Sequence, residues 1–502
     1  MLASLSSLPP ELYTAIFNQA EPEHLQSTVL ALSRTLPTHP VPVYHIFECI
    51  RLHQPQRVVQ LERRLRTGLD ERLWVKEFSL ESWIVDPDVL INLIKPLPNL
   101  CRLSLFIGPS WGPDHLDDLF DGSRWPELRF LSLKFKPYVQ KATYLQFMKG
   151  AYFDGALDAL SKWPESKIQT ISIVQDPLDP AIAKKQTFAQ PLVFFHLDPF
   201  TRLVRSPYLR SASHFRLRVP SRQVARYLHA LPGSLPRLEI LDLSTCNVNE
   251  SDVVSILGRF TMLRHLVLDN CGVIRGELRE GQWSDFGKSC ATAAVKRAKD
   301  REKKLKTWLE ITHARTAGDV DANIRLQGGQ VPTKAPKRGR RGLATATISL
   351  RASPPRDAVP LPIPVVNDLR AGGKIPKIRI LPSYPSLLSF TTTVRLEDRR
   401  DVARAEFEKG WTEGLAQVAS IRTRLRQSAM NGVRVMKFLE DEQCMFEEGL
   451  EDLDDVEEED WEVDIEKLKH PSLCLAGPDR QAEHFDGCGH YAAWGIWRDI
   501  VE

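Results

Sequence analysis

One spacing of apolar residues recurs along this chain and constrains its fold more than any other feature. The segments LPRLEILDLSTCNV and FTMLRHLVLDNCGV align position by position, with three leucines spaced Leu-x-x-Leu-x-Leu and a cysteine three residues after the last leucine. Self-similarity at a fixed period is typical of chains built from stacked structural repeats. The aligned residues are Leu238, Leu241, Leu243 and Cys246, then Leu263, Leu266, Leu268 and Cys271.

The same spacing recurs less regularly upstream, and most starts fall about 25 to 28 residues apart. The upstream members are Val75/Phe78/Leu80, Leu100/Leu103/Leu105, Leu128/Leu131/Leu133, Ile168/Ile171/Ile173 and Ala212/Phe215/Leu217. The pattern resembles a leucine-rich repeat. Two longer gaps, from 128 to 168 and from 168 to 212, indicate either inserted loops or a degenerate repeat.

Helix signals lie between the expected strands. Capping residues precede apolar side chains at helical spacing at Asp86, Asp114, Ser221 and either Asn249 or Ser251, which predicts capped helices with one buried face. Neither such a helix nor a short strand hides its apolar side alone, so stacking of neighbouring repeats is the stable arrangement. The predicted fold is α/β, an irregular leucine-rich-repeat solenoid with a curved parallel sheet whose leucines point inward.

The N-terminus carries a second signal. In LPPELYTAIF, the prolines favour the start of a helix, and the apolar side chains that follow lie on one face of it. A second helix is expected in EPEHLQSTVLALSRTL. The segment from Leu8 to Phe17, followed by His24-Leu25 and Val29 to Arg34, resembles an F-box. That resemblance implies docking on the small adaptor of an SCF-type cullin–RING ubiquitin ligase. The implied adaptor-binding residues are Leu8, Pro9, Leu12, Ile16, Phe17, Leu25 and Val29. The alternative is that these helices only cap the solenoid.

Composition favours a soluble intracellular protein, cytoplasmic or nuclear or both. The apolar runs are too short to span a bilayer, and the N-terminus lacks the pattern of a secretory signal, so we expect no membrane partner. Eight cysteines at irregular spacing with no CxxC are not a secreted disulfide framework, and we expect reduced thiols.

Five segments are predicted along the 502 residues. They are an F-box-like helical motif at 1–50, the solenoid at 51–275, a basic helix and flexible insert at 276–372, closing repeat strands and a helix at 373–440, and an acidic tail with a C-terminal segment at 441–502. The basic helix is expected at 288–312, the closing strands at 378–394 and the later helix from Leu396 to Leu439.

Charge is segregated in the second half of the chain. Basic residues from Lys337 to Arg341 suit a nuclear-import signal or a phosphate-binding patch, but no aromatic residue interleaves with them. A solvated loop is therefore preferred, and nucleic acid is not an expected partner. The acidic stretch from Leu439 to Leu468 is expected to be disordered, with the further hypothesis that it folds back on the basic insert.

Catalytic and metal sites have little support in the sequence. No GxxxxGK[ST], HExxH or GxGxxG occurs, so we predict no enzyme activity and no cofactor. The C-terminal segment holds four possible metal ligands, Cys474, His484, Cys488 and His490, which is the number that a structural zinc site needs. Their spacing matches no standard zinc finger, and Cys488-Gly-His490 is tight for two ligands of one ion. We therefore predict packed or exposed side chains there and no metal site.

These observations favour a non-catalytic protein-binding receptor. The specific hypothesis is the substrate-recognition subunit of an SCF-type ubiquitin ligase, with an unknown protein substrate on the solenoid. The alternative is a leucine-rich-repeat scaffold that binds proteins without any ligase.

Overall fold

The computed structural model describes most of the chain. The described residues are 8–20, 22–39, 41–121, 125–136, 152–179, 193–194, 196–229, 233–271, 281–327, 377–393, 400–439, 449–462, 468, 470–477, 484–485 and 487–497. Everything below concerns these residues.

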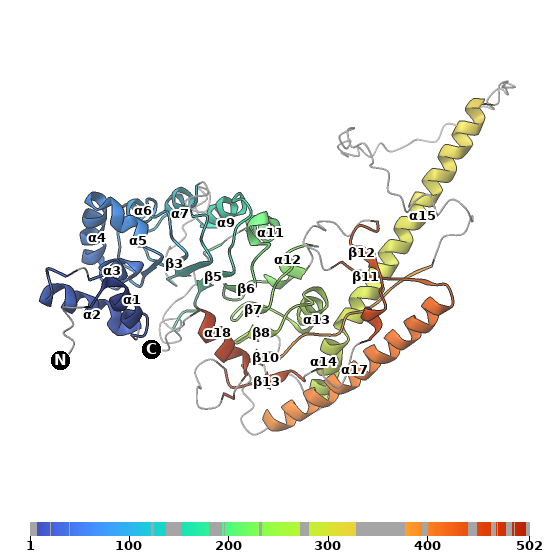
Figure 1. The fold of residues 1–502 in the computed structure, drawn as a ribbon. Helices are drawn as coiled ribbons and strands as arrows, with labels where there is room; N and C mark the ends of the chain where they lie inside the picture. Colours follow the sequence, from blue (N-terminus) through green and yellow to red (C-terminus); the bar gives the residue numbers. More distant parts are fainter. Residues whose placement is uncertain are drawn as a thin grey trace, which may run out of the picture.

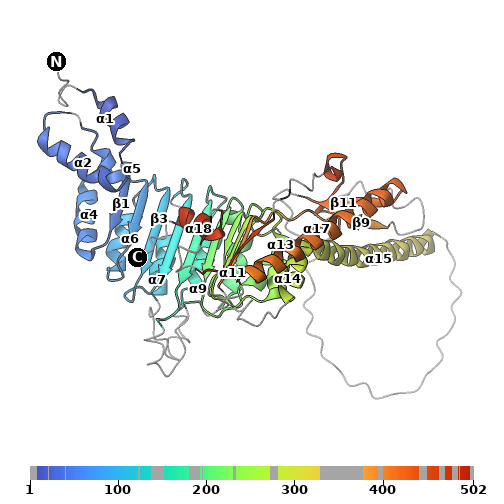
Figure 2. The same cartoon turned by 90° about the horizontal axis from the view of Figure 1, so that it is seen from below.

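A ten-stranded parallel sheet runs through the molecule (Figures 1 and 2). Its strands are β1 (Cys49–Leu52), β2 (Glu77–Leu80), β3 (Arg102–Ile107), β4 (Phe130–Phe135), β5 (Thr170–Gln175), β6 (His214–Arg218), β7 (Ile240–Asp242), β8 (His265–Leu268), β10 (Ser389–Thr392) and β13 (Ser472–Cys474). They lie in that order, each hydrogen-bonded to the next. The predicted fold class, a leucine-rich-repeat solenoid with a parallel sheet, is confirmed.

Helices cover one face of this sheet (Figure 1). They are α4 (Pro55–Thr67), α5 (Leu69–Trp74), α6 (Pro87–Ile94), α7 (Pro113–Phe120), α9 (Asp154–Ser161), α11 (Asp198–Arg205), α12 (Ala225–His229) and α13 (Glu250–Arg259). The expected caps hold at Asp86 and Asn249, whose side chains accept hydrogen bonds from Asp88 N and Asp252 N. They fail at the other two positions: Asp114 lies inside the first turn of α7, and Ser221 occupies a turn with φ of 61° before α12.

The repeat leucines form the core between sheet and helices. Leu241, Leu243, Leu266 and Leu268 are fully buried, as predicted. The cysteine of each of these repeats hydrogen-bonds to a backbone carbonyl of the preceding repeat. The Cys246 thiol donates to Leu217 O at 3.3 Å, and the Cys271 thiol donates to Leu243 O at 3.1 Å. Burial raises the pKa of Cys246 to about 12, so this thiol is a packing group rather than a nucleophile.

The two long gaps in the repeat pattern are insertions. Residue pairs such as Ile171 with Leu131 join β5 directly to β4, and Phe215 with Ile171 joins β6 directly to β5. Because neighbouring strands are hydrogen-bonded, no further strand lies between them. The alternative of a degenerate, unseen repeat is therefore wrong.

Inserted segments separate β8 from β10 and β10 from β13. Between β8 and β10 lie α14 (Gln282–Ala291), α15 (Ala293–Gln327) and β9 (Ile378–Ile380). Between β10 and β13 lie α17 (Arg400–Met430), β11 (Arg434–Phe438) and β12 (Leu453–Asp455), and β9, β11 and β12 form a small second sheet. The predicted buried stripe of α17 is confirmed at Phe407, Trp411, Leu415 and Val418. This helix ends at Met430 rather than near Leu439, because Gly432 then adopts a φ of 81° and the chain turns into β11.

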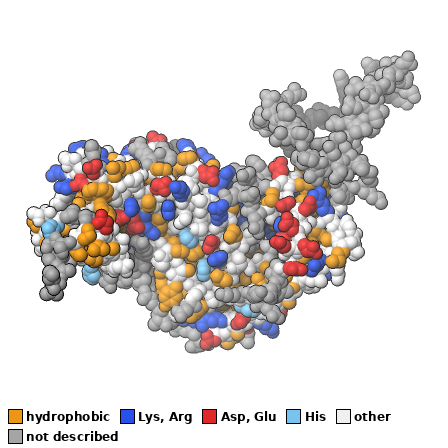
Figure 3. Space-filling view, in the orientation of Figure 1, with side chains coloured by type: hydrophobic (Ala, Val, Ile, Leu, Met, Phe, Trp, Pro, Cys, Tyr) orange, Lys and Arg blue, Asp and Glu red, His pale blue; other side chains and the backbone are white. Residues whose placement is uncertain are grey.

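The acidic stretch is ordered where the structure describes it, so the expectation of a disordered tail is wrong for residues 449–462. Asp452 is buried in an ion pair with Arg301 of α15, and Asp455 pairs with Arg434 at 2.9 Å. Acidic side chains gather on this part of the molecule in Figure 3. The acidic stretch therefore folds back on the basic helix. Lys337 to Arg341 lies outside the described residues.

The C-terminal helix α18 (Gly489–Trp497) lies on the sheet face opposite the repeat helices, which we call the open face (Figures 1 and 2). Ala493 and Trp497 pack there against Phe130, Ile240 and Val267, whose side chains alternate with the core leucines. The described helices include none with the length and apolar character that a bilayer span requires.

Candidate functional sites

The N-terminal helices form a small module with its own core. It comprises α1 (Pro10–Phe17), α2 (Pro22–Thr35) and α3 (Tyr44–Glu48), joined through buried Tyr13, Phe17, Val29 and Val41. This cluster is separate from the solenoid core, which begins with Ile50 and Leu52 of β1 and Val58 of α4.

The residues expected to bind the adaptor divide into two groups by exposure. Pro9, Leu12 and Ile16 are exposed, with Leu12 at 47% and Ile16 at 50%. Leu8 and Leu25 are half-buried. Phe17 and Val29 lie in the core of the module, so they hold the helices together and cannot touch a partner in this arrangement. Figure 3 shows hydrophobic side chains on the surface at the N-terminal end of the molecule.

Among the described residues, α18 covers one part of the open face and leaves another part uncovered. The helix α18 covers the strands from β4 to β8, where the Arg216 guanidinium also lies 5.3 Å from the centre of the Trp497 ring. Nearer the N-terminus, the rings of Trp83 and Phe106 pack in a tilted arrangement with centroids 4.6 Å apart and stay partly exposed. The neighbouring Ile84 is 75% exposed.

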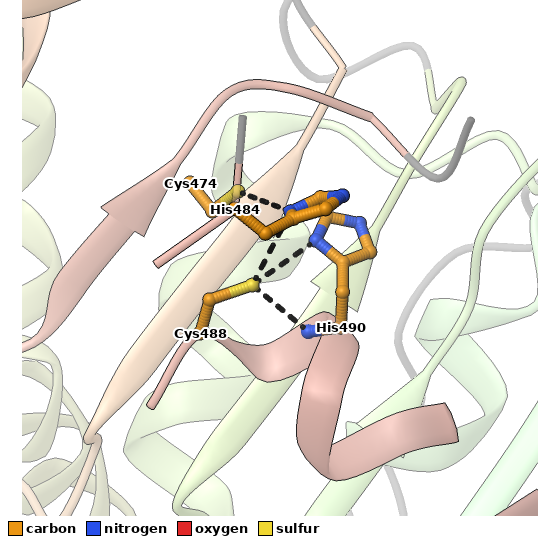
Figure 4. Close-up of side chains that lie close together, drawn as sticks. All are labelled: Cys474, His484, Cys488 and His490. Carbon is orange, nitrogen blue, oxygen red and sulfur yellow. Dashed lines mark hydrogen bonds between the residues drawn. The ribbon is translucent and has the colours of Figure 1, made fainter. Parts of the chain in front are cut away.

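Four sulfur and nitrogen donors converge where α18 meets the sheet (Figure 4). Cys474 ends β13, Cys488 and His490 stand at the start of α18, and His484 precedes them. The candidate ligand atoms all lie within 4.8 Å of one another. The fold thus brings all four donors to one point, as packed side chains, and the expected absence of a metal site stays a prediction.

Contacts inside this cluster join each sulfur to a ring nitrogen. Cys474 Sγ lies 3.3 Å from His484 Nδ1, and Cys488 Sγ lies 3.5 Å from His484 Nδ1 and 3.4 Å from His490 Nδ1. The backbone N–H of His490 also donates to Cys488 Sγ at 3.3 Å. None of the seven described cysteines forms a disulfide.

Asp269 orients His490 from the far side of the cluster. Its Oδ2 lies 2.7 Å from His490 Nε2, and its Oδ1 accepts from the Thr393 hydroxyl at 3.0 Å. Burial lowers the pKa of His490, but hydrogen bonds to Asp269 and Cys488 outweigh that effect and raise it to about 9. The pKa of the Cys488 thiol is lowered, chiefly by its hydrogen bond with Cys474 and, after an opposing effect of burial, by His490.

Sequence reasoning missed Asp269. Asp269 follows the last leucine of a repeat, far from the cluster in the chain, and no local signal marks it. Gly489, between Cys488 and His490, lies tightly against β10. A Cβ atom there would meet the Ser389 hydroxyl at 2.7 Å and a Thr391 methyl at 2.9 Å.

Comparisons with known proteins give only distant structural likeness. No family model matches the chain, and no curated protein matches it. Among solved structures, the yeast Rad7–Elc1 complex matches at 14% identity with a TM-score of 0.29, covering 52% of this chain and 54% of the other. An internalin from Listeria monocytogenes matches at 14% identity with a TM-score of 0.23, covering 44% and 48%. The matched region thus spans about half of each of these chains.

Proposed function

We propose that this chain is a non-catalytic substrate receptor of an SCF-type ubiquitin ligase. The N-terminal module would dock on the ligase adaptor, and the solenoid would hold a target protein near the site of ubiquitin transfer. The contribution to the reaction is proximity, since the receptor places target and ligase in one complex.

The observation that carries the proposal is the exposed apolar face of α1. Leu12 and Ile16 lie one turn apart and each keeps about half of its surface in solvent. Their neighbours Tyr13 and Phe17 fill the module's own core, so the helix is held firmly while the outer face stays free. An exposed apolar face of this kind marks a protein interaction site.

The alternative role, a cap of the solenoid, accounts less well for this arrangement. A cap shields the open end of a repeat core with its own apolar side chains. Here α4 provides that cover through Val58 and Leu65, which are buried in the solenoid core, and the N-terminal module adds Phe47 of α3 against the same core. The N-terminal module keeps a core of its own and leaves Leu12 and Ile16 outside both cores.

The uncovered part of the open face is the proposed place for the target. Trp83 and Phe106 form a tilted aromatic pair, and exposed Ile84 follows Trp83 in the sequence. The Lys134 ammonium, which pairs with Asp176 at 3.5 Å, lies 5.3 Å from the centre of the Phe106 ring. Large aromatic side chains dominate the binding energy of many protein interfaces, which supports this patch as the anchor for a target.

Adaptor binding tests the proposal. The full chain with Leu12→Glu and Ile16→Glu should bind the purified adaptor at least about tenfold more weakly than wild type, because two charges would enter an apolar interface. Isothermal titration calorimetry measures the affinity. The matched control is Met262→Glu, which changes an apolar side chain of 48% exposure far from the module.

Two results would contradict the docking proposal. One is unchanged affinity in the double variant, and the other is a wild-type chain that does not bind the adaptor at all. In the second case the scaffold without a ligase becomes the better description, since the solenoid and its open face remain.

A further inference from the structure

We propose that Cys474, His484, Cys488 and His490 bind one zinc ion, which fastens the C-terminal helix α18 to the open face of the solenoid. The proposal is independent of adaptor docking, because the cluster lies at the opposite end of the sheet from the N-terminal module. Figure 4 shows the four side chains turned toward a common point.

Ligand type and number fit zinc. Two thiols and two imidazoles are the donor set of many structural zinc sites, which are closed and four-coordinate. Soft sulfur ligands disfavour magnesium and calcium, which prefer oxygen. Cys474, Cys488 and His490 are buried, so an ion held there would be closed off from solvent as in a structural site.

The spacing of the donor atoms fits a tetrahedron. With Zn–S of about 2.3 Å and Zn–N of about 2.0 Å, tetrahedral geometry separates a sulfur from a nitrogen ligand by about 3.5 Å. The three sulfur–nitrogen contacts of the cluster measure 3.3, 3.5 and 3.4 Å. Three of the six donor–donor distances therefore match the edges of a coordination tetrahedron, and all six lie within 4.8 Å.

A second layer of contacts prepares both His490 and Cys488 as ligands. Because His490 Nε2 lies 2.7 Å from the Asp269 carboxylate, Nε2 donates to Asp269, and a bound metal would take the place of the proton on Nδ1, which faces the cluster. Carboxylate–histidine pairs of this kind orient zinc ligands in many proteins. The backbone N–H of His490 donates to Cys488 Sγ, which favours a thiolate there.

Hydrogen bonds within the cluster are the alternative to a metal. A proton on His484 Nδ1 can be shared by Cys474 Sγ and Cys488 Sγ, and a proton on His490 Nδ1 can be donated to Cys488 Sγ. The same contacts are expected around one cation bound to all four donors, so the metal content distinguishes the two arrangements.

The consequence of zinc binding is mechanical. Its ligands come from the last strand of the sheet and from the start of α18, so the ion would tie the two elements together. The rest of α18 then lies across the open face, with Trp497 packed against Ile240 and Val267. Zinc would thereby set how much of the open face is left for a target.

Metal content of the purified full-length chain tests the proposal. Elemental analysis by mass spectrometry should find about one zinc per chain in wild type, as a closed four-ligand site implies. The Cys474→Ser/Cys488→Ser variant should lose the zinc, and the matched control Cys101→Ser, a thiol outside the cluster, should retain it. Replacement of zinc by Co²⁺ should produce the visible absorption of tetrahedral thiolate coordination in wild type alone.

Two further measurements keep the test decisive if the double variant fails to fold. Asp269→Asn leaves all four ligands in place and should weaken zinc binding about 10- to 100-fold in a chelator competition. Removal of zinc from wild type with a chelator should increase hydrogen exchange in residues 489–497 while exchange in β2 to β5 stays unchanged.

Wild-type chain without zinc and without cobalt absorption would overturn the proposal. So would a disulfide between Cys474 and Cys488 in the protein purified under non-reducing conditions. Zinc that survives the double cysteine substitution would place the ion elsewhere and would equally contradict it.

Discussion

Asp242 is a fully buried carboxylate at the end of β7, and it holds two arginines of the neighbouring strand. Its Oδ2 lies 2.6 Å from Arg218 Nη2 and 3.3 Å from Arg216 Nε, and its Oδ1 accepts from Ser244 N at 2.9 Å. Arg216 in turn contacts the Trp497 ring of α18. A single carboxylate thus links the repeat turn to the helix that covers the open face.

Removal of this charge should destabilise the protein. Asp242→Asn leaves two buried or half-buried guanidinium groups without their counter-ion, which costs about 3 to 5 kcal/mol at neutral pH. Urea unfolding measures the loss. Asp401→Asn is the control, because that side chain is 96% exposed, and it should change stability by less than about 0.5 kcal/mol.

The cost of Asp242→Asn should also depend on pH. Burial raises the pKa of Asp242, but Arg218 and Arg216 outweigh it and hold the pKa below its usual range. The unfolded chain therefore binds a proton first, at a pKa of about 3.9, and the stability from this group is lost as pH falls below that value. The difference in free energy of unfolding between wild type and Asp242→Asn should therefore become smaller as the pH falls below about 3.9. A difference that stays constant down to about pH 3 would contradict this assignment.

At the scale of elements, the pair α14 and α17 depends on close backbone contact. Gly410 of α17 lies against α14 so tightly that a Cβ atom would meet Ser284 O at 1.8 Å. Phe286, Phe390 and Phe407 pack together around this crossing, which connects the inserted helices to strand β10. The crossing therefore supports the last part of the main sheet as well as the insertion.

Gly410→Ala should force the two helices apart. We expect a loss of about 1 to 3 kcal/mol, which is typical of overpacking in a filled interior. Thermal unfolding and hydrogen exchange in α17 measure the effect. Gly495→Ala is the matched control, because no atom lies within 4 Å of its Cβ position and alanine favours a helix. Equal behaviour of the two variants would show that the crossing tolerates a wider separation.

At the scale of the whole molecule, the two ends of the solenoid differ in what they leave free. The N-terminal end carries the exposed α1 face and the uncovered aromatic pair of Trp83 and Phe106. The C-terminal end is closed by α18, the inserted helices and the Cys–His cluster. Docking and target recognition are thus proposed for the N-terminal half.

Trp83→Ala should separate target binding from adaptor binding. This substitution removes the indole from the proposed target patch. Loss of such a side chain from an interface hot spot costs at least about 2 kcal/mol of binding free energy. Quantitative affinity-purification mass spectrometry should show wild-type targets depleted by the substitution, with the adaptor retained. Equal recovery of every target would exclude the Trp83 patch as the anchor, and loss of the adaptor as well would indicate a general folding defect.

The repeat architecture and the helical N-terminal motif were open to prediction because their signals are local. Leu241 and Leu243, and likewise Phe407 and Trp411, lie within one strand or one helix, so their burial follows from spacing alone. The same kind of pattern predicted an apolar face of the first helix with Leu12, Ile16 and Phe17 on it, and the F-box resemblance implied that this face contacts a partner. Its division into surface residues such as Ile16 and core residues such as Phe17 came only from the packing of α2 and α3 against it.

Other features depend on residues that are distant in sequence, and only the tertiary structure decided them. Asp269 meets His490 across 221 positions, and Arg301 meets Asp452 across 151. Spacing within the C-terminal segment did not indicate that the four donors of the Cys–His cluster meet. They meet because β13, the Gly489 turn against β10 and α18 together bring them to one point. Periodicity thus determined which side chains are buried in each repeat, whereas the path of the chain determined which polar side chains meet.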